Sequence, residues 1–132
     1  MNKARKTMLK STILLSIKPQ YAKAILENRK AYEFRKRRCK NSVKKIIFYS
    51  TAPQSQVVGE AEIEEIIEDS PHKVWEIAKH AAGITYKQYC AYYQGYSKAV
   101  AYKLSNVIVY KEPKPLIDYG VKHVPQSFIY LD

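Results

Sequence analysis

The stretch LLSIKPQYAKAILENRKAYEFRKR, residues 14–37, decides the fold because its hydrophobic periodicity changes from strand to helix and back to strand. Its first residues complete an apolar run, residues 12–17, which is typical of a buried strand. Lys18-Pro19 then opens a helix, because proline is tolerated in the first helical turn. Asn28 can end that helix in a left-handed conformation. The first half of the stretch therefore predicts a buried strand that leads directly into a short helix.

The end of the stretch alternates in the way a strand does. Successive side chains of a strand point to opposite faces. One face would carry two aromatic residues and the other would carry charges: Tyr32, Phe34 and Lys36 against Glu33, Arg35 and Arg37. We expect the aromatic face to pack into the core and the charged face to present its groups to a ligand.

The rest of the chain carries alternating strand and helix signals. Strands are expected at residues 44–50, 57–68, 98–110 and 127–131. Two helices follow, because Ser70 is a good N-cap before Pro71 and because Thr85 and Gln88 fit a capping box. Pro113 is expected to break the strand before it, and residues 116–124 are expected to form a loop with a short ordered piece.

Residues 57–68, VVGEAEIEEIIE, are the main ambiguity, because their glutamates also tolerate a helix. We favour a strand, in which Gly59 marks a bulge. Helices then interrupt a largely antiparallel sheet instead of alternating with parallel strands. This order predicts an α+β fold with a small, closed or nearly closed mixed sheet that carries helices at its ends.

Composition limits the class of protein. The 132 residues are 46% hydrophobic and 27% charged, which is the balance of one globular domain, residues 12–132. Residues 1–11 resemble a flexible basic leader. The apolar run after them is too short for a membrane span and is ended by Lys18-Pro19 before any signal-peptide cleavage site. The two cysteines and three histidines show no disulfide or metal-ligand pattern. A cytoplasmic protein without metal or cofactor is expected.

Positive charge is concentrated in one third of the chain. The net charge is +11, but residues 1–45 carry +13 and residues 46–132 carry −2. A cationic face of this kind favours a polyanion, nucleic acid before an anionic membrane. A basic surface that is merely solvated is the alternative.

Several motifs together resemble the activating-signal-cointegrator homology (ASCH) domain of the PUA-like superfamily. The strand and helix of LLSIKPQYA are followed by a turn and strand, NRKAYEFR, in which Asn28 stands where the family has glycine. Residues 49–53, Val58-Gly59 and residues 125–131 also resemble family segments in their order. The resemblance implies a PUA-like β-barrel with about three peripheral helices and a cleft for nucleic acid or a nucleotide beside the first helix. Members of this branch are described as transcriptional regulators, so a regulatory role is also implied.

The expected binding residues combine cations, aromatic rings and hydroxyls. Arg35, held by Glu33, would grip a phosphate, and Lys18 would add an anion-binding corner at the helix start. Tyr21 or Tyr130 would stack on a base. The full set that we expect at this cleft is Lys18, Tyr21, Lys30, Glu33, Arg35, Arg37, Ser50, Thr51, Ser127 and Tyr130. The expected partner is RNA or single-stranded nucleic acid, with the base and the oligomeric state left open.

Three alternatives stay open. A Glu33–Arg35 pair can simply close the barrel. The domain can be a hydrolase, since one ASCH subgroup resembles an amidohydrolase and other members resemble ribonucleases. Lys30 matches the amidohydrolase lysine, but Glu33 stands where that subgroup has threonine, which favours binding over hydrolysis, and no catalytic residue is assigned. The basic face can also meet an acidic protein.

Overall fold

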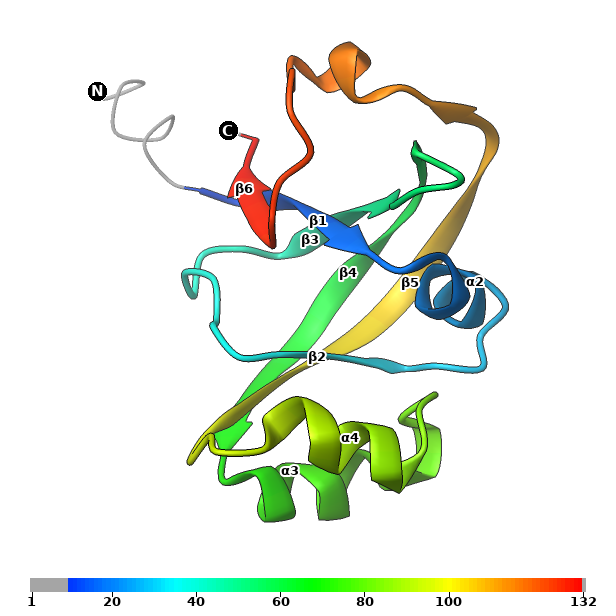
Figure 1. The fold of residues 1–132 in the computed structure, drawn as a ribbon. Coiled ribbons are helices and arrows are strands. Elements are labelled where there is room, and N and C mark those ends of the chain that lie inside the picture. Colours follow the sequence, from blue (N-terminus) through cyan, green and yellow to red (C-terminus); the bar gives the residue numbers. More distant parts are fainter. Residues whose placement is uncertain (1–9, 132) are drawn as a thin grey trace, which may run out of the picture.

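A six-stranded sheet forms the centre of the structure, a computed structural model that describes residues 10–131 (Figure 1). The strand order is β2-β5-β4-β3-β1-β6, with β1 and β3 parallel and every other neighbouring pair antiparallel. The strands are β1 (Thr12–Ile17), β2 (Tyr32–Arg35), β3 (Lys45–Ser50), β4 (Gln56–Asp69), β5 (Ala99–Lys114) and β6 (Phe128–Tyr130). The sheet curls into a half-barrel, so the predicted α+β fold is confirmed. Residues 1–9 of the expected leader lie outside the described part of the chain.

Three α-helices surround the sheet, as expected. They are α2 (Pro19–Leu26), α3 (Pro71–Ala78) and α4 (Tyr86–Tyr93), with short 3₁₀ segments at Lys79–Ala81 and Leu116–Tyr119. Pro19 occupies the first turn of α2, and Asn28 takes the left-handed conformation after it, with φ 61°. The predicted capping box of Thr85 and Gln88 is present at the start of α4. In residues 10–131 no helix has the length and apolar character needed to span a bilayer.

The ambiguous segment 57–68 is a strand because it pairs on both sides. β4 lies between β3 and β5, and this pairing outweighs the helix preference of its glutamates. The pairing register shifts beside Gly59, which confirms the expected bulge. β5 continues past the expected break to Lys114. Pro113 lies between the Val57–Lys114 and Gly59–Val109 pairs, where the register shifts. Proline is tolerated at such an irregularity, because its missing N–H is not required for the ladder there.

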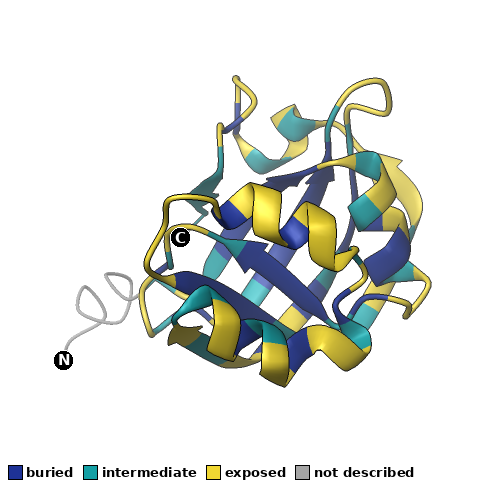
Figure 2. Ribbon diagram, turned by 60° about the horizontal axis from the view of Figure 1, so that its bottom comes forward, coloured by how far each residue is buried: buried dark blue, intermediate teal, exposed yellow. Residues whose placement is uncertain are grey.

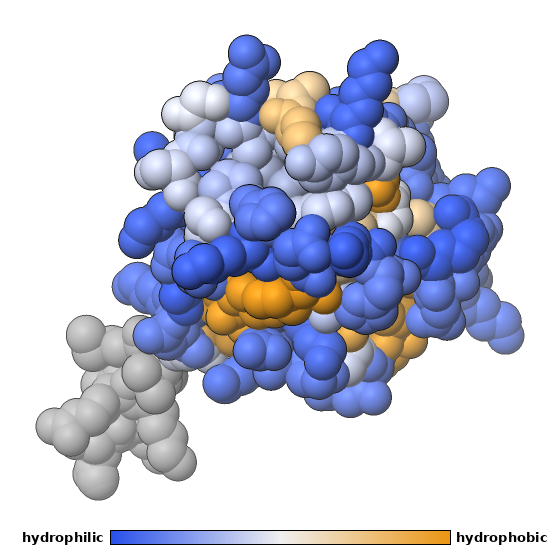
Figure 3. All heavy atoms as spheres, turned by 90° about the horizontal axis from the view of Figure 1, so that it is seen from below, coloured by the Kyte–Doolittle hydropathy of each residue, from blue (hydrophilic) through white to orange (hydrophobic). Residues whose placement is uncertain are grey.

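Two apolar clusters fix the elements around β2. The larger cluster fills the inside of the half-barrel and includes Phe48 and Tyr102, both fully buried. The second joins Tyr32 and Phe34 of β2 to α3 and α4, which lie below this strand in Figure 1 and come to the front in Figure 2. The outer surface on the side of α3 and α4 is mostly hydrophilic around a central group of apolar side chains (Figure 3). The aromatic face of β2 is therefore packed against the helices, as the alternation predicted.

The half-barrel is open along one seam. β2 and β6 are the two edge strands of the sheet, and side chains connect them across the gap. The main link is Arg35, whose Nη2 donates to the Ser16 carbonyl of β1 at 2.6 Å and whose Nη1 donates to Ser127 Oγ at 3.4 Å. Because the edges are joined by side chains, space for a ligand remains between them.

Candidate functional site

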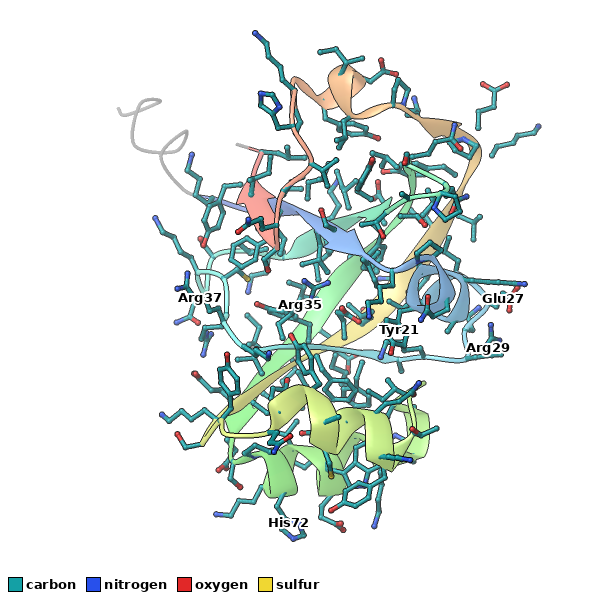
Figure 4. All side chains as sticks on the ribbon, in the orientation of Figure 1. Tyr21, Glu27, Arg29, Arg35, Arg37 and His72 are labelled. Atoms are coloured by element: carbon teal, nitrogen blue, oxygen red, sulfur yellow. The ribbon has the colours of Figure 1, made fainter. Side chains whose placement is uncertain are left out.

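A cavity of about 770 Å³ opens at this seam. Its wall is built by five segments that are distant in the sequence. They are the end of β1 with the start of α2, the turn and strand from Lys30 to Arg35, Thr51 after β3, Ile84 with one side of α4, and Pro125-Gln126. Figure 4 shows Tyr21 and Arg35 at this place, between β2, α2 and β1. The cavity therefore lies beside the first helix, where the resemblance placed a cleft.

Lys30, Glu33 and Arg35 form the charged centre of the cavity. Arg35 Nε donates to Glu33 Oε2 at 3.0 Å, and Lys30 Nζ lies 3.8 Å from Glu33 Oε1. The side chains of Lys30 and Glu33 are almost completely buried, and that of Arg35 is 14% exposed. One carboxylate thus holds two cations, which leaves the centre positively charged.

Lys30 is held in a fixed position within this centre. Its Nζ donates to the Ala82 carbonyl at 2.7 Å and lies 4.8 Å from the ring centroid of Phe34 and 5.3 Å from that of Tyr21. Gly83, with φ +69°, packs directly on the Lys30 stem, where any Cβ would collide with it. Burial lowers the pKa of Lys30 from its ordinary value, an effect that Arg35 increases and Glu33 opposes. The amine therefore loses its proton more easily than an exposed lysine does.

The mouth of the cavity is formed by the start of α2. Lys18 is the N-cap residue and is exposed, and no side chain caps the helix there. Gln20 and Tyr21 of the first turn also line the wall, and Thr51 faces them from the end of β3. A helix N-terminus carries partial positive charge. It adds to the charge of Lys18 at the point where a ligand would enter.

Six of the ten expected residues line this cavity. They are Lys18, Tyr21, Lys30, Glu33, Arg35 and Thr51. The other four do not line it, for different reasons. Ser127 does not reach the wall but accepts a hydrogen bond from Arg35. Ser50 is fully buried at the end of β3, and its hydroxyl has no hydrogen-bond partner among the described residues. The hydroxyl of Tyr130 accepts from Lys40 N at 3.1 Å, away from the wall.

Arg37 does not lie at the cavity, contrary to the prediction. The alternation placed it on the strand face of Glu33 and Arg35, but β2 ends at Arg35. The chain then turns away, with the buried Tyr102 hydroxyl accepting from Cys39 N at 2.8 Å and donating to the Arg37 carbonyl at 3.4 Å. Arg37 is exposed and lies away from the cavity (Figure 4).

The side of α4 that faces the cavity was not expected to be part of the site. Gln88, Ala91 and Tyr92 line the cavity. Tyr89 and Tyr93 form a core stripe that is buried against β2 and α3, whereas Tyr86 is 56% exposed. A signal was available, since Gln88 and Tyr92 are four residues apart and fall on one face outside that stripe.

Comparisons with known proteins place this geometry in a family. Residues 11–125 match the model of a domain of unknown function, DUF365. The chain is 32% identical to part of ATP synthase subunit alpha and 31% identical to part of large ribosomal subunit protein uL22, both from Ureaplasma parvum serovar 3. These matches cover 92% and 91% of the chain but only 15% and 39% of the two relatives.

ASCH proteins of Zymomonas mobilis are also similar. An ASCH domain-containing ribonuclease is 33% identical over 92 residues, which are 69% of this chain and 62% of that protein. The crystal structure of ASCH from this organism superposes with a TM-score of 0.85 and 28% identity, covering 92% of this chain and 88% of that one. A serine-to-alanine variant of the same protein gives the same TM-score. The chain belongs to the DUF365 family and is an ASCH domain with the PUA-like fold.

Proposed function

We propose that this domain binds single-stranded RNA and takes one nucleotide into the seam cavity. The observation that carries the proposal is the charged centre, in which Lys30 and Arg35 share the single carboxylate of Glu33 inside a cavity of about 770 Å³. This volume is within the range of sites for small organic ligands, roughly 300–1,000 Å³. A cationic cavity of that size suits an anionic ligand such as a nucleotide.

Each part of the cavity has a matching part in a nucleotide. Arg35 has five N–H donors, of which three are used by Glu33, Ser16 and Ser127, so donors remain for a phosphate. The free oxygen lone pairs of Glu33 can accept from an exocyclic amine of a base. Tyr21, at the mouth, offers a ring for stacking. Two relatives are named as a ribonuclease and as a ribosomal subunit protein, which supports RNA as the polyanion.

Lys18→Ala tests the proposal without disturbing the core, because Lys18 is exposed. We expect it to weaken binding of single-stranded RNA severalfold and to reduce the slope of log affinity against log salt by about 0.7, the value for one lost phosphate contact on a single strand. Fluorescence anisotropy at several salt concentrations with oligonucleotides of each base measures both quantities.

Lys23→Ala is the matched control for this experiment. Lys23 is an exposed lysine on the same helix, and it does not line the cavity. It should change the affinity much less than Lys18→Ala does. Equal effects of the two variants would show that RNA meets the basic surface generally and not the cavity.

RNA cleavage in the same cavity is a second candidate function, and the lowered pKa of Lys30 favours it. A neutral amine can act as a general base. In this step Lys30 Nζ takes the proton of a 2′-hydroxyl, the 2′-oxygen bonds to the adjacent phosphorus, and the bond to the 5′-oxygen breaks. The 5′-oxygen takes a proton from solvent, and the products are a 2′,3′-cyclic phosphate and a 5′-hydroxyl.

Lys30→Met tests whether Lys30 is the general base. We expect the wild-type cleavage rate to rise with pH and level off at the Lys30 pKa, below its ordinary value of 10.5, because the neutral amine is the active form. The variant should lose about a hundredfold or more in rate. Gel analysis of end-labelled RNA, with DNA of the same sequence as the uncleavable control, gives the measurement. Equal cleavage by the variant would exclude Lys30 as the base.

A further inference from the structure

We propose that the cavity continues onto an aromatic ledge, formed by Lys36, Tyr92 and Tyr96, which binds the nucleotide next to the one held in the cavity. The ligand would then be a single strand of at least two nucleotides. The inference rests on the proposed function, because it adds a second position to the same RNA site.

The ledge is continuous with the cavity. Tyr92 belongs to both, since it lines the cavity and its ring centroid lies 4.5 Å from Lys36 Nζ. The same ammonium lies 4.6 Å from the ring centroid of Tyr96. Lys36 directly follows Arg35, which belongs to the charged centre. A strand that leaves the cavity past Arg35 and Tyr92 would therefore meet this lysine between two rings.

Both rings of the ledge are open to solvent, unlike the core tyrosines of α4. Tyr92 is 36% exposed and Tyr96 is 49% exposed, whereas Tyr89 and Tyr93 are 2% and 3% exposed. Tyr92 rests edge-on against Tyr93, with ring centroids 4.8 Å apart, so the core supports it from one side. Aromatic rings that are exposed but supported can accept a base without rearranging the fold.

A defined turn places Tyr96. Gly95 follows α4 with φ +84°, a conformation that glycine adopts most readily. The Tyr96 N–H donates to the Tyr93 carbonyl at 2.9 Å and closes the turn. The chain thereby reverses, and the Tyr96 ring lies beside Lys36. The local backbone thus keeps the second ring of the ledge in position.

The chemistry of the ledge matches a nucleotide better than an acidic peptide. Rings that stack on bases, next to a cation that can meet the backbone phosphate, are the usual elements of single-strand recognition. Lys36 is exposed and lies over the rings, and within residues 10–131 it forms no ion pair with an acidic side chain, so its charge remains available to a phosphate. An acidic peptide would use the lysine but not the rings.

The test compares short ligands that differ in length. Nucleoside 5′-monophosphates of the four bases probe the cavity, and homopolymeric RNA trinucleotides probe the cavity and the ledge together. We expect trinucleotides to bind more tightly than monophosphates to the wild-type protein. Tyr96→Ala and Lys36→Ala should each reduce the trinucleotide affinity and leave the monophosphate affinity unchanged. The loss in Tyr96→Ala should be about tenfold. Isothermal titration calorimetry measures all of these affinities.

Tyr86→Ala is the matched control, because Tyr86 is an exposed tyrosine of α4 that packs on Trp75 and does not line the cavity. It should leave both affinities unchanged. If monophosphates bind but trinucleotides gain nothing, or if the gain persists in Tyr96→Ala and Lys36→Ala, the ledge is refuted and the cavity stands. If neither kind of ligand binds the wild-type protein, the proposed function fails and the ledge fails with it.

Discussion

Glu33→Ala is expected to lower the free energy of unfolding by about 3–5 kcal/mol, the usual cost of removing one partner from a buried ion pair. Glu33 is the only carboxylate lining the seam cavity among the described residues, and its side chain is 6% exposed. Its removal would leave Lys30 Nζ and the Arg35 guanidinium close together without a counter-charge. Equilibrium unfolding in urea, followed by circular dichroism, measures the loss.

Glu27→Ala is the matched control for this prediction. Glu27 pairs with Arg29 at 2.7 Å, a shorter distance than either contact of Glu33, but both side chains are about half exposed. Solvent screens such a pair, so its loss should cost less than about 1 kcal/mol. Glu33→Gln should cost less than Glu33→Ala, because it keeps the shape of the side chain and one acceptor. Equal losses in Glu27→Ala and Glu33→Ala would contradict the buried-centre interpretation.

Arg35→Ala is expected to weaken binding of single-stranded RNA by about ten- to a hundredfold, which corresponds to one lost charge-assisted contact. Arg35 lines the cavity and also links β2 to Ser16 and Ser127 across the seam. The variant therefore loses a ligand contact and the support that keeps the seam at its width. Anisotropy titrations at fixed salt give the change in affinity.

Two further variants keep this prediction testable if Arg35→Ala folds poorly. Arg35→Lys keeps the charge but lacks the planar fork that holds Glu33 and Ser16 together, so it should give an intermediate affinity. Arg29→Ala removes an exposed arginine that follows α2 and does not line the cavity, so it should change the affinity little (Figure 4). RNA affinity that is the same in Arg35→Lys, Arg35→Ala and the wild type would refute the role of Arg35.

Local sequence signals predicted the elements because they act over a few residues. Pro19 begins α2, Asn28 ends the turn after it, and Thr85 with Gln88 caps α4. The alternation of Tyr32 to Arg35 identified the packed face of β2 correctly. Its extension to Arg37 failed, because the end of a strand depends on its partner, and the β2–β5 ladder stops at the Arg35–Val100 pair.

The membership of the site was harder to predict. Lys18 to Arg35 lie close together in sequence, so their place in one cavity followed from a short stretch and a resemblance. Tyr92 and Gln88 enter from α4, and their contribution depends on how α4 packs against β2. No local pattern in the sequence determines how closely α4 packs against β2. Ser50 and Tyr130 were expected at the cavity but do not line it, for the same reason. Ser50 is buried in the core, and the Tyr130 hydroxyl contacts Lys40.

The sequence by itself determined the strands and helices other than β4, the packed face of β2 and the concentration of positive charge in residues 1–45. Periodicity and capping residues encode the strands and helices locally, and the charge follows from composition. Only the tertiary structure decided that β4 is a strand, that Lys30 is buried beside Gly83 and Ala82, and that an open seam leaves a cavity. Each of these depends on contacts between segments far apart in the chain, and burial in such contacts sets the charge, the pKa of Lys30 and the shape of the site.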